Sequence, residues 1–237
     1  MRRLPEWLGH AVATGRHLLP QACALCRAPS ALAMLCEPCR RTLPRVGPAC
    51  ARCALPCAQA VCATCARSPP PWRRAVAAWR YAYPMDRLLR GLKYAGQLAL
   101  AEPLADGLAD ALGEAPADDR PDAVVPLPLA PRRQRERGFD QARLIASRVA
   151  QRIGVPLLPA LTRVRDAGPQ AALPLAAREA NVRDAFAMRC SVRGMRVALV
   201  DDVLTTGATL SSAARVLKRA GAADIEAWVV ARTLPPQ

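Results

Sequence analysis

The spacing of the cysteines constrains the first third of this 237-residue chain more than any other feature. Nine of the ten cysteines lie between Cys23 and Cys65, and eight of these form two copies of a pattern in which two Cys-x-x-Cys pairs are eight or nine residues apart. Each pair presents two sulfurs from one tight turn, and two such turns complete a tetrahedral four-cysteine zinc site. We therefore predict two structural zinc ions. The expected ligands are Cys23, Cys26, Cys36 and Cys39 in the first site and Cys50, Cys53, Cys62 and Cys65 in the second.

A disulfide framework is the alternative interpretation of these cysteines, and it needs an oxidising compartment. Residues 1–20 are a poor secretory signal, because Glu6, Arg16 and His17 interrupt any apolar core. Cys57 has no partner in the spacing. We expect it to be a spare thiol, with replacement of another ligand as the alternative.

A short segment with two metal sites suggests a separate module. Residues 20–68 are too few to bury a self-sufficient core, so metal has to stabilise them, and a closed four-thiolate site leaves no open position for catalysis. A run of three prolines follows Ser68. We predict an N-terminal segment at 1–19, a double zinc ribbon at 20–68, a Pro-rich linker at 69–73 and a larger domain at 74–237.

The formal charge of +15 points to an anionic partner. Two filled tetrathiolate sites, each with a net charge of −2, would lower it to +11. Lys93 and Lys218 are the only two lysines, and the other basic residues are arginines, which suit phosphate recognition but can also reflect a GC-rich genome. With 52% hydrophobic residues the chain is not a disordered tail. No apolar run approaches the roughly 18 to 20 residues of a membrane-spanning helix.

The larger domain alternates between strand and helix patterns. We expect strands at 75–83, 122–127, 196–203 and 225–231, helices at 85–94, 98–112, 140–153 and 211–220, and a mobile loop at 163–174. Such an alternation predicts an α/β fold with a parallel sheet covered on both faces.

The segment at 197–210 carries the most specific chemistry. Four apolar residues predict a strand that ends in Asp201 and Asp202, and a Thr- and Gly-containing loop then leads into a helix. Ligands bind at the carboxyl ends of parallel strands, and amide groups at a helix N-terminus bind anions. Threonine hydroxyls can add donors to a phosphate, and two carboxylates can accept hydrogen bonds from sugar hydroxyls. This combination predicts a site for a ribose 5-phosphate unit.

The same segment resembles the phosphoribosyl-pyrophosphate (PRPP) motif of type I phosphoribosyltransferases. The whole chain between about 20 and 235, with a double zinc ribbon ahead of such a domain, is similar to the competence protein F (ComF) family. The further segments that carry this resemblance are Lys93-Tyr94-Ala95-Gly96, Val125-Pro126-Leu127-Pro128, Arg137-Gly138-Phe139-Asp140-Gln141, 170–173, Arg178, Asn181, Ala185 and Phe186. The implied fold is a parallel-sheet phosphoribosyltransferase fold preceded by a small four-cysteine zinc-ribbon module.

The resemblance also implies roles for individual residues. Asp201 and Asp202 would hold the ribose hydroxyls, with Mg²⁺ near the pyrophosphate. The loop that holds the 5-phosphate would consist of Thr205, Thr206, Gly207, Ala208 and Thr209. The turn after Val125, with Pro126, would be the pyrophosphate loop, and 164–181 would be a flexible flap. Other residues expected near the pyrophosphate loop or on the flap are Arg137, Gln170, Arg178 and Asn181.

Two further features bear on the substrate. The resemblance implies that Thr205 stands where hypoxanthine- and guanine-type phosphoribosyltransferases have an acid that serves the purine as base. A threonine cannot do this at neutral pH, which disfavours purine salvage of that type. The basic run 132–137 is a solvated loop, a clamp for pyrophosphate or a path for a nucleic-acid backbone. With only nine aromatic residues in the chain, a broad base-stacking platform is not indicated.

Three functions remain open from the sequence. The first is the ComF-like one: a cytoplasmic protein that binds PRPP or a related sugar phosphate and acts with single-stranded DNA and DNA-uptake proteins in natural transformation. The second is a phosphoribosyltransferase that displaces pyrophosphate with an unknown nitrogen base. The third is a regulator that senses the ligand. Salt-dependent DNA binding would favour the first function. Pyrophosphate release with one nucleobase would favour the second, and a sequence-specific operator would favour the third.

Overall fold

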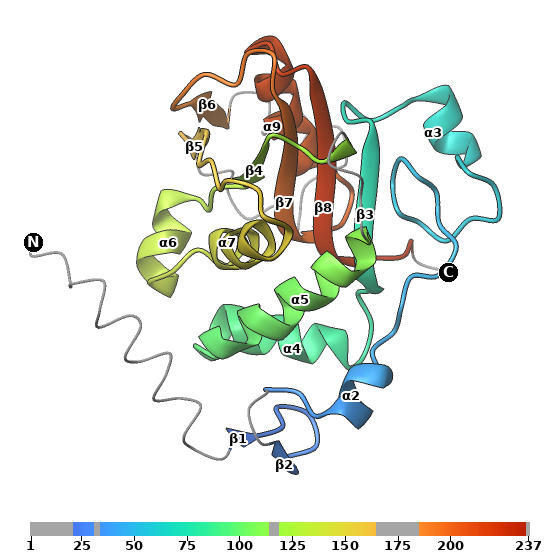
Figure 1. The fold of residues 1–237 in the computed structure, drawn as a ribbon, viewed down its shortest axis with the longest axis vertical. Coiled ribbons are helices and arrows are strands. Elements are labelled where there is room, and N and C mark those ends of the chain that lie inside the picture. Colours follow the sequence, from blue (N-terminus) through green and yellow to red (C-terminus); the bar gives the residue numbers. More distant parts are fainter. Residues whose placement is uncertain (1–20, 31–33, 114–118, 165–184, 236–237) are drawn as a thin grey trace, which may run out of the picture. The chain divides into compact units, whose positions relative to one another are not determined.

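The structure is a computed structural model, and it describes residues 21–30, 34–113, 119–164 and 185–235 (Figure 1). The chain divides into two compact units, residues 1–43 and 44–237. The first cysteine tetrad lies in the smaller unit, and the second lies in the larger unit together with the main sheet. None of the helices in the described ranges combines the length and the apolar character that crossing a membrane requires.

The smaller unit has very little regular structure. Strands β1 (Gln21–Ala22) and β2 (Pro29–Ser30) pair antiparallel around the first cysteine turn, and helix α2 spans Glu37–Arg41. Its buried apolar side chains include Cys23, Leu35 and Leu43. So small a core cannot offset the conformational entropy of ordering the segment, which explains why four clustered cysteines are needed here.

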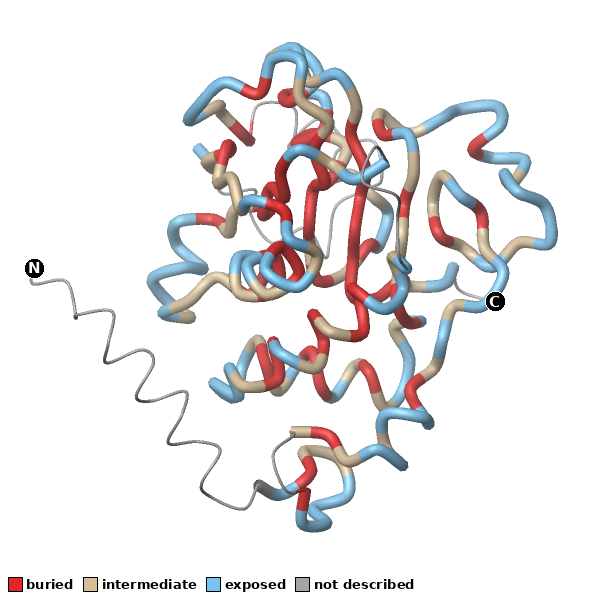
Figure 2. Tube along the Cα trace, in the orientation of Figure 1, coloured by how far each residue is buried: buried red, intermediate tan, exposed pale blue. Residues whose placement is uncertain are grey.

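A four-stranded parallel sheet forms the centre of the larger unit. Its order is β3 (Arg74–Arg80), β8 (Asp224–Arg232), β7 (Arg196–Leu204) and β4 (Ala123–Pro126), and each neighbouring pair is parallel. β7 and β8 are almost completely buried, as Figure 2 shows, because helices cover both faces of the sheet. The predicted α/β class with a parallel sheet is confirmed.

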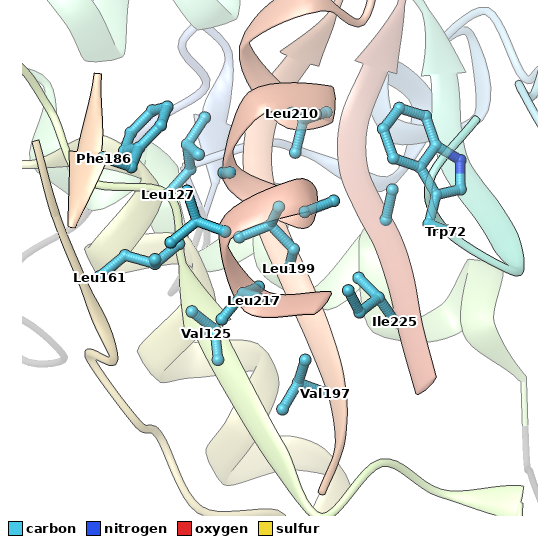
Figure 3. Close-up of a cluster of buried hydrophobic side chains, with 14 of the residues drawn as sticks. Trp72, Val125, Leu127, Leu161, Phe186, Val197, Leu199, Leu210, Leu217 and Ile225 are labelled. Carbon is cyan, nitrogen blue, oxygen red and sulfur yellow. The ribbon is translucent and has the colours of Figure 1, made fainter. Parts of the chain in front are cut away.

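Helices α5 (Ala101–Leu112) and α7 (Gln141–Ile153) pack on one face of the sheet, and α9 (Ala208–Arg219) packs on the other. Alternation along β7 sends Val197 and Leu199 toward α9, where they meet Leu210 and Leu217 in the cluster of Figure 3. The amphipathic helix α4 (Met85–Tyr94) and the short 3-10 helix η1 (Leu98–Leu100) precede α5. Burial on both faces accounts for the continuous apolar runs in the strand sequences.

Most predicted elements occur at the expected places. Helix 85–94 is confirmed residue for residue, whereas the expected helix at 98–112 begins as η1, and α9 begins three residues earlier than expected. Helix α6 (Pro131–Arg137) was not predicted as a helix, and neither were the two paired strands β5 (Leu161–Arg163) and β6 (Phe186–Met188). Of the loop expected at 163–174, the first residue belongs to β5, and 165–174 lie outside the described residues.

Candidate sugar-phosphate site and zinc centres

Both predicted cysteine tetrads are assembled in the structure. In each tetrad the four sulfur atoms lie within 4.8 Å of one another. Measured Sγ–Sγ distances are 3.6 Å for Cys26 and Cys36 and 3.8 Å for Cys53 and Cys62, too long for a disulfide, whose S–S bond is about 2.05 Å. Zn–S bonds of about 2.3 Å in a tetrahedron put the sulfurs about 3.8 Å apart. The geometry therefore fits zinc ions and not a disulfide framework.

The pKa values of the tetrad thiols also fit a cation bound between the sulfurs. Against the cost of burial, backbone amides of Cys62 and Arg52 donate to the Cys50 sulfur and lower the pKa of this thiol to about 6. In the first tetrad the Cys36 sulfur, together with burial, raises the pKa of Cys39 to about 12. Four crowded sulfurs resist carrying several negative charges unless a positive ion lies between them.

Cys57 takes no part in either tetrad, and its thiol donates to Gln59 Oε1 over 3.2 Å.

The second tetrad is bonded directly to the sheet of its unit. Ala75 N in β3 donates to Ala51 O over 2.8 Å. The indole Nε1 of Trp72 donates to Arg52 O over 2.7 Å, and the Arg52 guanidinium donates back to Trp72 O over 3.2 Å. Trp72 itself is buried in the core cluster (Figure 3). The second tetrad is thus part of the same packed body as the strand that carries the acid pair.

Asp201 and Asp202 lie near the carboxyl end of β7, as predicted. The Asp202 side chain is buried and forms an ion pair with Lys93 Nζ from α4. Apart from Lys93, none of the described residues donates a hydrogen bond to Asp202 Oδ2. Although burial opposes it, Asp202 raises the pKa of Lys93, so the lysine stays charged. Burial, and then the charge of Asp202, raise the pKa of Asp201 well above its usual range.

A short loop connects the end of β7, two residues after the acid pair, to the start of α9. Thr205 and Thr206 are exposed, and Gly207 has a φ of +81°, a left-handed conformation that favours glycine. Gly207 is the N-cap of α9, so the first amides of this helix face the loop. Ala208 N donates to the Thr206 hydroxyl over 3.4 Å. The residues from Thr205 to Thr209 therefore form a compact turn with amide and hydroxyl donors, which suits an anion.

The predicted pyrophosphate loop lies beside the end of β7 that carries the acid pair. Pro126, the last residue of β4, pairs with Val200, and Leu127 N donates to Val200 O over 2.9 Å, directly before the acid pair. Val125 and Pro126 are buried in β4, so the exposed part of this loop begins after them. Asp140 accepts hydrogen bonds from Leu129 N (3.2 Å) and from Arg143 N in α7 (3.1 Å), and so holds the loop against the start of that helix.

A buried arginine connects the turn that begins at Thr205 to the second tetrad. Arg232, at the end of β8, donates to Leu204 O (2.8 Å) and Thr205 O (2.5 Å) from Nη1, and its Nε donates to Cys53 O over 2.8 Å. One guanidinium thus fixes the first residue of the loop and a zinc-ligand backbone together. Burial lowers the pKa of Arg232, although the Cys53 and Cys65 thiols oppose this.

The structure brings together most of the predicted site and adds residues to it. Arg137 lies at the end of α6, 5.2 Å from the Tyr94 ring and near Lys93 in a pocket of about 430 Å³. The predicted flap residues Gln170, Arg178 and Asn181 lie outside the described residues. Sequence reasoning did not assign Lys93 or Arg232 to the site, although the rarity of lysine in an arginine-rich chain singles out Lys93.

The acid pair offers the hard oxygen ligands that Mg²⁺ prefers. Asp202 Oδ2 is buried with Lys93 as its single described partner, and Asp201 lies beside it. The donor chemistry therefore fits a divalent cation bound together with a phosphorylated ligand.

A parallel sheet with an acid pair and a turn rich in amide and hydroxyl donors at its carboxyl edge fits a phosphoribosyltransferase-type domain. In agreement, residues 140–234 match the family described as "Phosphoribosyl transferase domain". The purine phosphoribosyltransferase structure from Pyrococcus horikoshii Ot3 aligns with 54% of this chain and 70% of its own, at 19% identity and a TM-score of 0.35.

Similarity to curated relatives extends over nearly the whole chain. "DNA utilization protein YhgH" of Salmonella typhimurium is 35% identical over 224 residues, which cover 91% of this chain and 99% of the relative. "Competence protein F" of Haemophilus influenzae is 32% identical over 178 residues, which cover 72% of this chain and 78% of that protein. The chain belongs to the family that includes these two proteins, as the sequence motifs predicted.

Proposed function

We propose that the carboxyl edge of β4 and β7 binds PRPP or a related ribose 5-phosphate, and that the protein acts on single-stranded DNA during its uptake or processing in the cytoplasm. The observation that carries the ligand proposal is the arrangement of three features at one sheet edge. An acid pair, an anion-binding turn at the start of α9, and the loop after β4 lie next to one another. Together they match the three parts of the ligand: the ribose diol, the 5-phosphate and the pyrophosphate.

Each part of the site has a chemical task in this proposal. Asp201 and Asp202 accept hydrogen bonds from the ribose hydroxyls, and the ion pair with Lys93 holds the Asp202 side chain in place. Amides and hydroxyls between Thr205 and Thr209 bind the 5-phosphate. Mg²⁺, bound with the ligand, would neutralise charge on the pyrophosphate.

The DNA part of the proposal is supported by charge and by the relatives. The formal charge of +15 favours a polyanionic partner. The relatives at 35% and 32% identity are named for DNA utilization and competence. In this proposal the zinc centres have a structural role, since four thiolates leave no open coordination position.

The ligand proposal is tested by calorimetric titration of PRPP with Mg²⁺ into the zinc-loaded protein. We expect the double variant Asp201→Asn, Asp202→Asn to lose at least about a hundredfold in affinity, because two charge-assisted hydrogen bonds are removed. The control is Glu102→Gln, Asp110→Asn, which removes two carboxylates of α5 that pair with Arg148 and Arg152 of α7 and not with Lys93. Absence of binding by the folded wild type, or equal affinity of the double variant, would overturn the proposal.

A further inference from the structure

Helix α4 carries an exposed basic and aromatic face that the proposed sugar-phosphate site does not use. The helix buries one side in the core, through Met85, Leu88, Leu89 and Leu92. Arg87, Arg90 and Tyr94 follow one another at helical spacing on the opposite, exposed side. Tyr83, just before the helix, lies against Arg87, with the guanidinium carbon 5.5 Å from the ring centre. We name these four residues the α4 face.

The two tyrosines are unusual for a protein surface. Tyr83 is 72% exposed and Tyr94 is 75% exposed, in a chain that has only three tyrosines. Each ring contacts an arginine, since Arg137 of α6 lies 5.2 Å from the centre of the Tyr94 ring. These contacts hold both rings beside cationic groups while leaving most of their surface open. The small number of aromatic residues argued against a broad base-stacking platform. The fold nevertheless exposes two tyrosines along one helix, which together form a short platform.

Charge on this surface is positive. Arg87, Arg90 and Arg133 form no ion pair with a carboxylate among the residues that the structure describes. The acid on α6, Glu136, is paired with Arg132 over 2.7 Å. On α4 the acid is Asp86, which is half-buried, lies one turn before Arg90 and forms no ion pair with it among the described residues.

The α4 face leads toward the proposed sugar-phosphate site. Tyr94 lines the pocket of about 430 Å³ together with Lys93, Arg133, Arg137 and Phe139. Lys93 in turn is the ion-pair partner of Asp202. A linear ligand on the α4 face would therefore end beside the acid pair of β7.

We propose that the α4 face binds single-stranded nucleic acid, with bases stacked on Tyr83 and Tyr94 and phosphates bound by Arg87 and Arg90. This proposal deepens the DNA role proposed above and rests on it. Alternating aromatic and guanidinium groups suit a strand whose bases are unpaired, because every base offers a face for stacking. From Arg87 to Tyr94 the helix rises about 10 Å, long enough for a short run of nucleotides. A duplex hides its base faces, and an acidic peptide has none to stack.

The test measures binding of a fluorescein-labelled oligothymidylate of about 20 nucleotides to the zinc-loaded full chain, at several salt concentrations. In Arg87→Gln, Arg90→Gln we expect the salt slope, log K against log[salt], to become shallower by about 1.4, the value for two lost phosphate contacts to a single strand. The control Arg215→Gln, Arg219→Gln removes two exposed arginines from α9 and is expected to keep the wild-type slope.

Stacking is tested separately with the tyrosines. We expect Tyr83→Ala, Tyr94→Ala to bind at least about tenfold more weakly, and Tyr83→Phe, Tyr94→Phe to bind like the wild type, because phenylalanine retains the stacking ring. A duplex of equal length should bind equally well to the wild type and to the double alanine variant.

The outcomes separate this proposal from the proposed function. If the wild type binds the oligonucleotide and the α4-face variants bind equally well, the α4 face is not the site, while the DNA role stands. If the wild type does not bind it, both the DNA role and the α4-face proposal fail. The variant Arg87→Gln, Arg90→Gln should bind PRPP as tightly as the wild type. If its PRPP affinity falls together with its oligonucleotide affinity, the defect is due to misfolding and the proposal is overturned.

Discussion

Lys93 and the two acids of β7 form the charged centre of the proposed site. Lys93 belongs to α4, and among the described residues it is the one that forms an ion pair with the buried carboxylate of Asp202. Its slender ammonium group fits a mostly buried position, where a planar guanidinium would need more space and more hydrogen-bond acceptors. The two adjacent acids therefore differ: Asp202 has a counter-ion, and Asp201 has the charge of Asp202 beside it.

This difference predicts opposite effects of two neighbouring substitutions on stability. The pKa of Asp201 is raised in the folded protein, so between the ordinary aspartate pKa of about 3.9 and the raised value the folded state binds more protons, and stability falls as pH rises. Asp201→Asn should therefore raise the melting temperature at about pH 8, with a smaller gain at about pH 5.5. Asp202→Asn should lower it, because Lys93 loses its partner.

Scanning calorimetry of the two single variants measures this contrast. A change of 1 kcal/mol in a chain of this size corresponds to about 2–4 °C. Two shifts of the melting temperature in the same direction would show that Asp201 and Asp202 share one environment, and would contradict the difference between them.

At the scale of elements, the two cysteine segments are repeats of one design. In each, the residue after the first Cys-x-x-Cys pair has a positive φ, at Arg27 (64°) and Ala54 (55°). In each, the third cysteine is the N-cap of a five-residue helix, at Cys36 before α2 and at Cys62 before α3 (Ala63–Arg67). The same local geometry recurs because a tetrahedral metal site requires two turns that each present two sulfurs.

The turn between β7 and α9 depends on the backbone of Gly207. Gly207→Ala introduces a Cβ that clears its neighbours by 3.4 Å or more but forces alanine into the left-handed region, at a cost of about 1–2 kcal/mol. Gly194→Ala is the matched control, because Gly194 has a φ of +75° and open space around its Cβ position. We expect both variants to lose similar stability in thermal unfolding, and only Gly207→Ala to lose PRPP affinity in calorimetry, by about tenfold or more. Equal affinities would mean that the turn does not bind the phosphate.

At the scale of the whole molecule, the second zinc knuckle is built into the body that carries the site. Three sets of hydrogen bonds join it to the sheet and to the turn between β7 and α9: Ala75 with Ala51, Trp72 with Arg52, and Arg232 with Cys53. Since Arg232 also holds the carbonyls of Leu204 and Thr205, a change at the knuckle is transmitted directly to the loop.

Loss of the second zinc should therefore weaken the sugar-phosphate site. We expect Cys62→Ser to lower zinc content by one ion per chain, to lower the melting temperature and to reduce PRPP affinity, because the Cys53 carbonyl no longer anchors Arg232. Cys36→Ser removes the corresponding ligand of the first tetrad and should lower zinc content equally while leaving PRPP affinity unchanged. Atomic absorption and calorimetry check both variants. Identical PRPP affinities in the two would argue against a link through Arg232.

Local patterns in the sequence determined the class of this protein. Metal ligands at fixed spacing and an acid pair followed by a Thr- and Gly-rich turn are short-range features, so the tetrads, the parallel sheet and the position of the acids at a strand end could all be predicted. Short-range signals also existed for α6, which starts at Pro131 and ends before Gly138 with a φ of +78°, although its arginines suggested a loop. Strands β5 and β6 are only three residues long, too short for a periodic pattern.

The contacts that complete the site were decided only by the tertiary structure. Lys93 meets Asp202, and Arg232 meets Cys53, across more than one hundred positions of sequence. The packing of two helices likewise brings Arg137 of α6 against Tyr94 of α4. No spacing rule connects such residues, because their meeting depends on how the helices pack on the sheet and not on the conformation of any one segment. The sequence by itself therefore identified the acids and the sulfurs, and the packing of the whole unit determined the partners that position them.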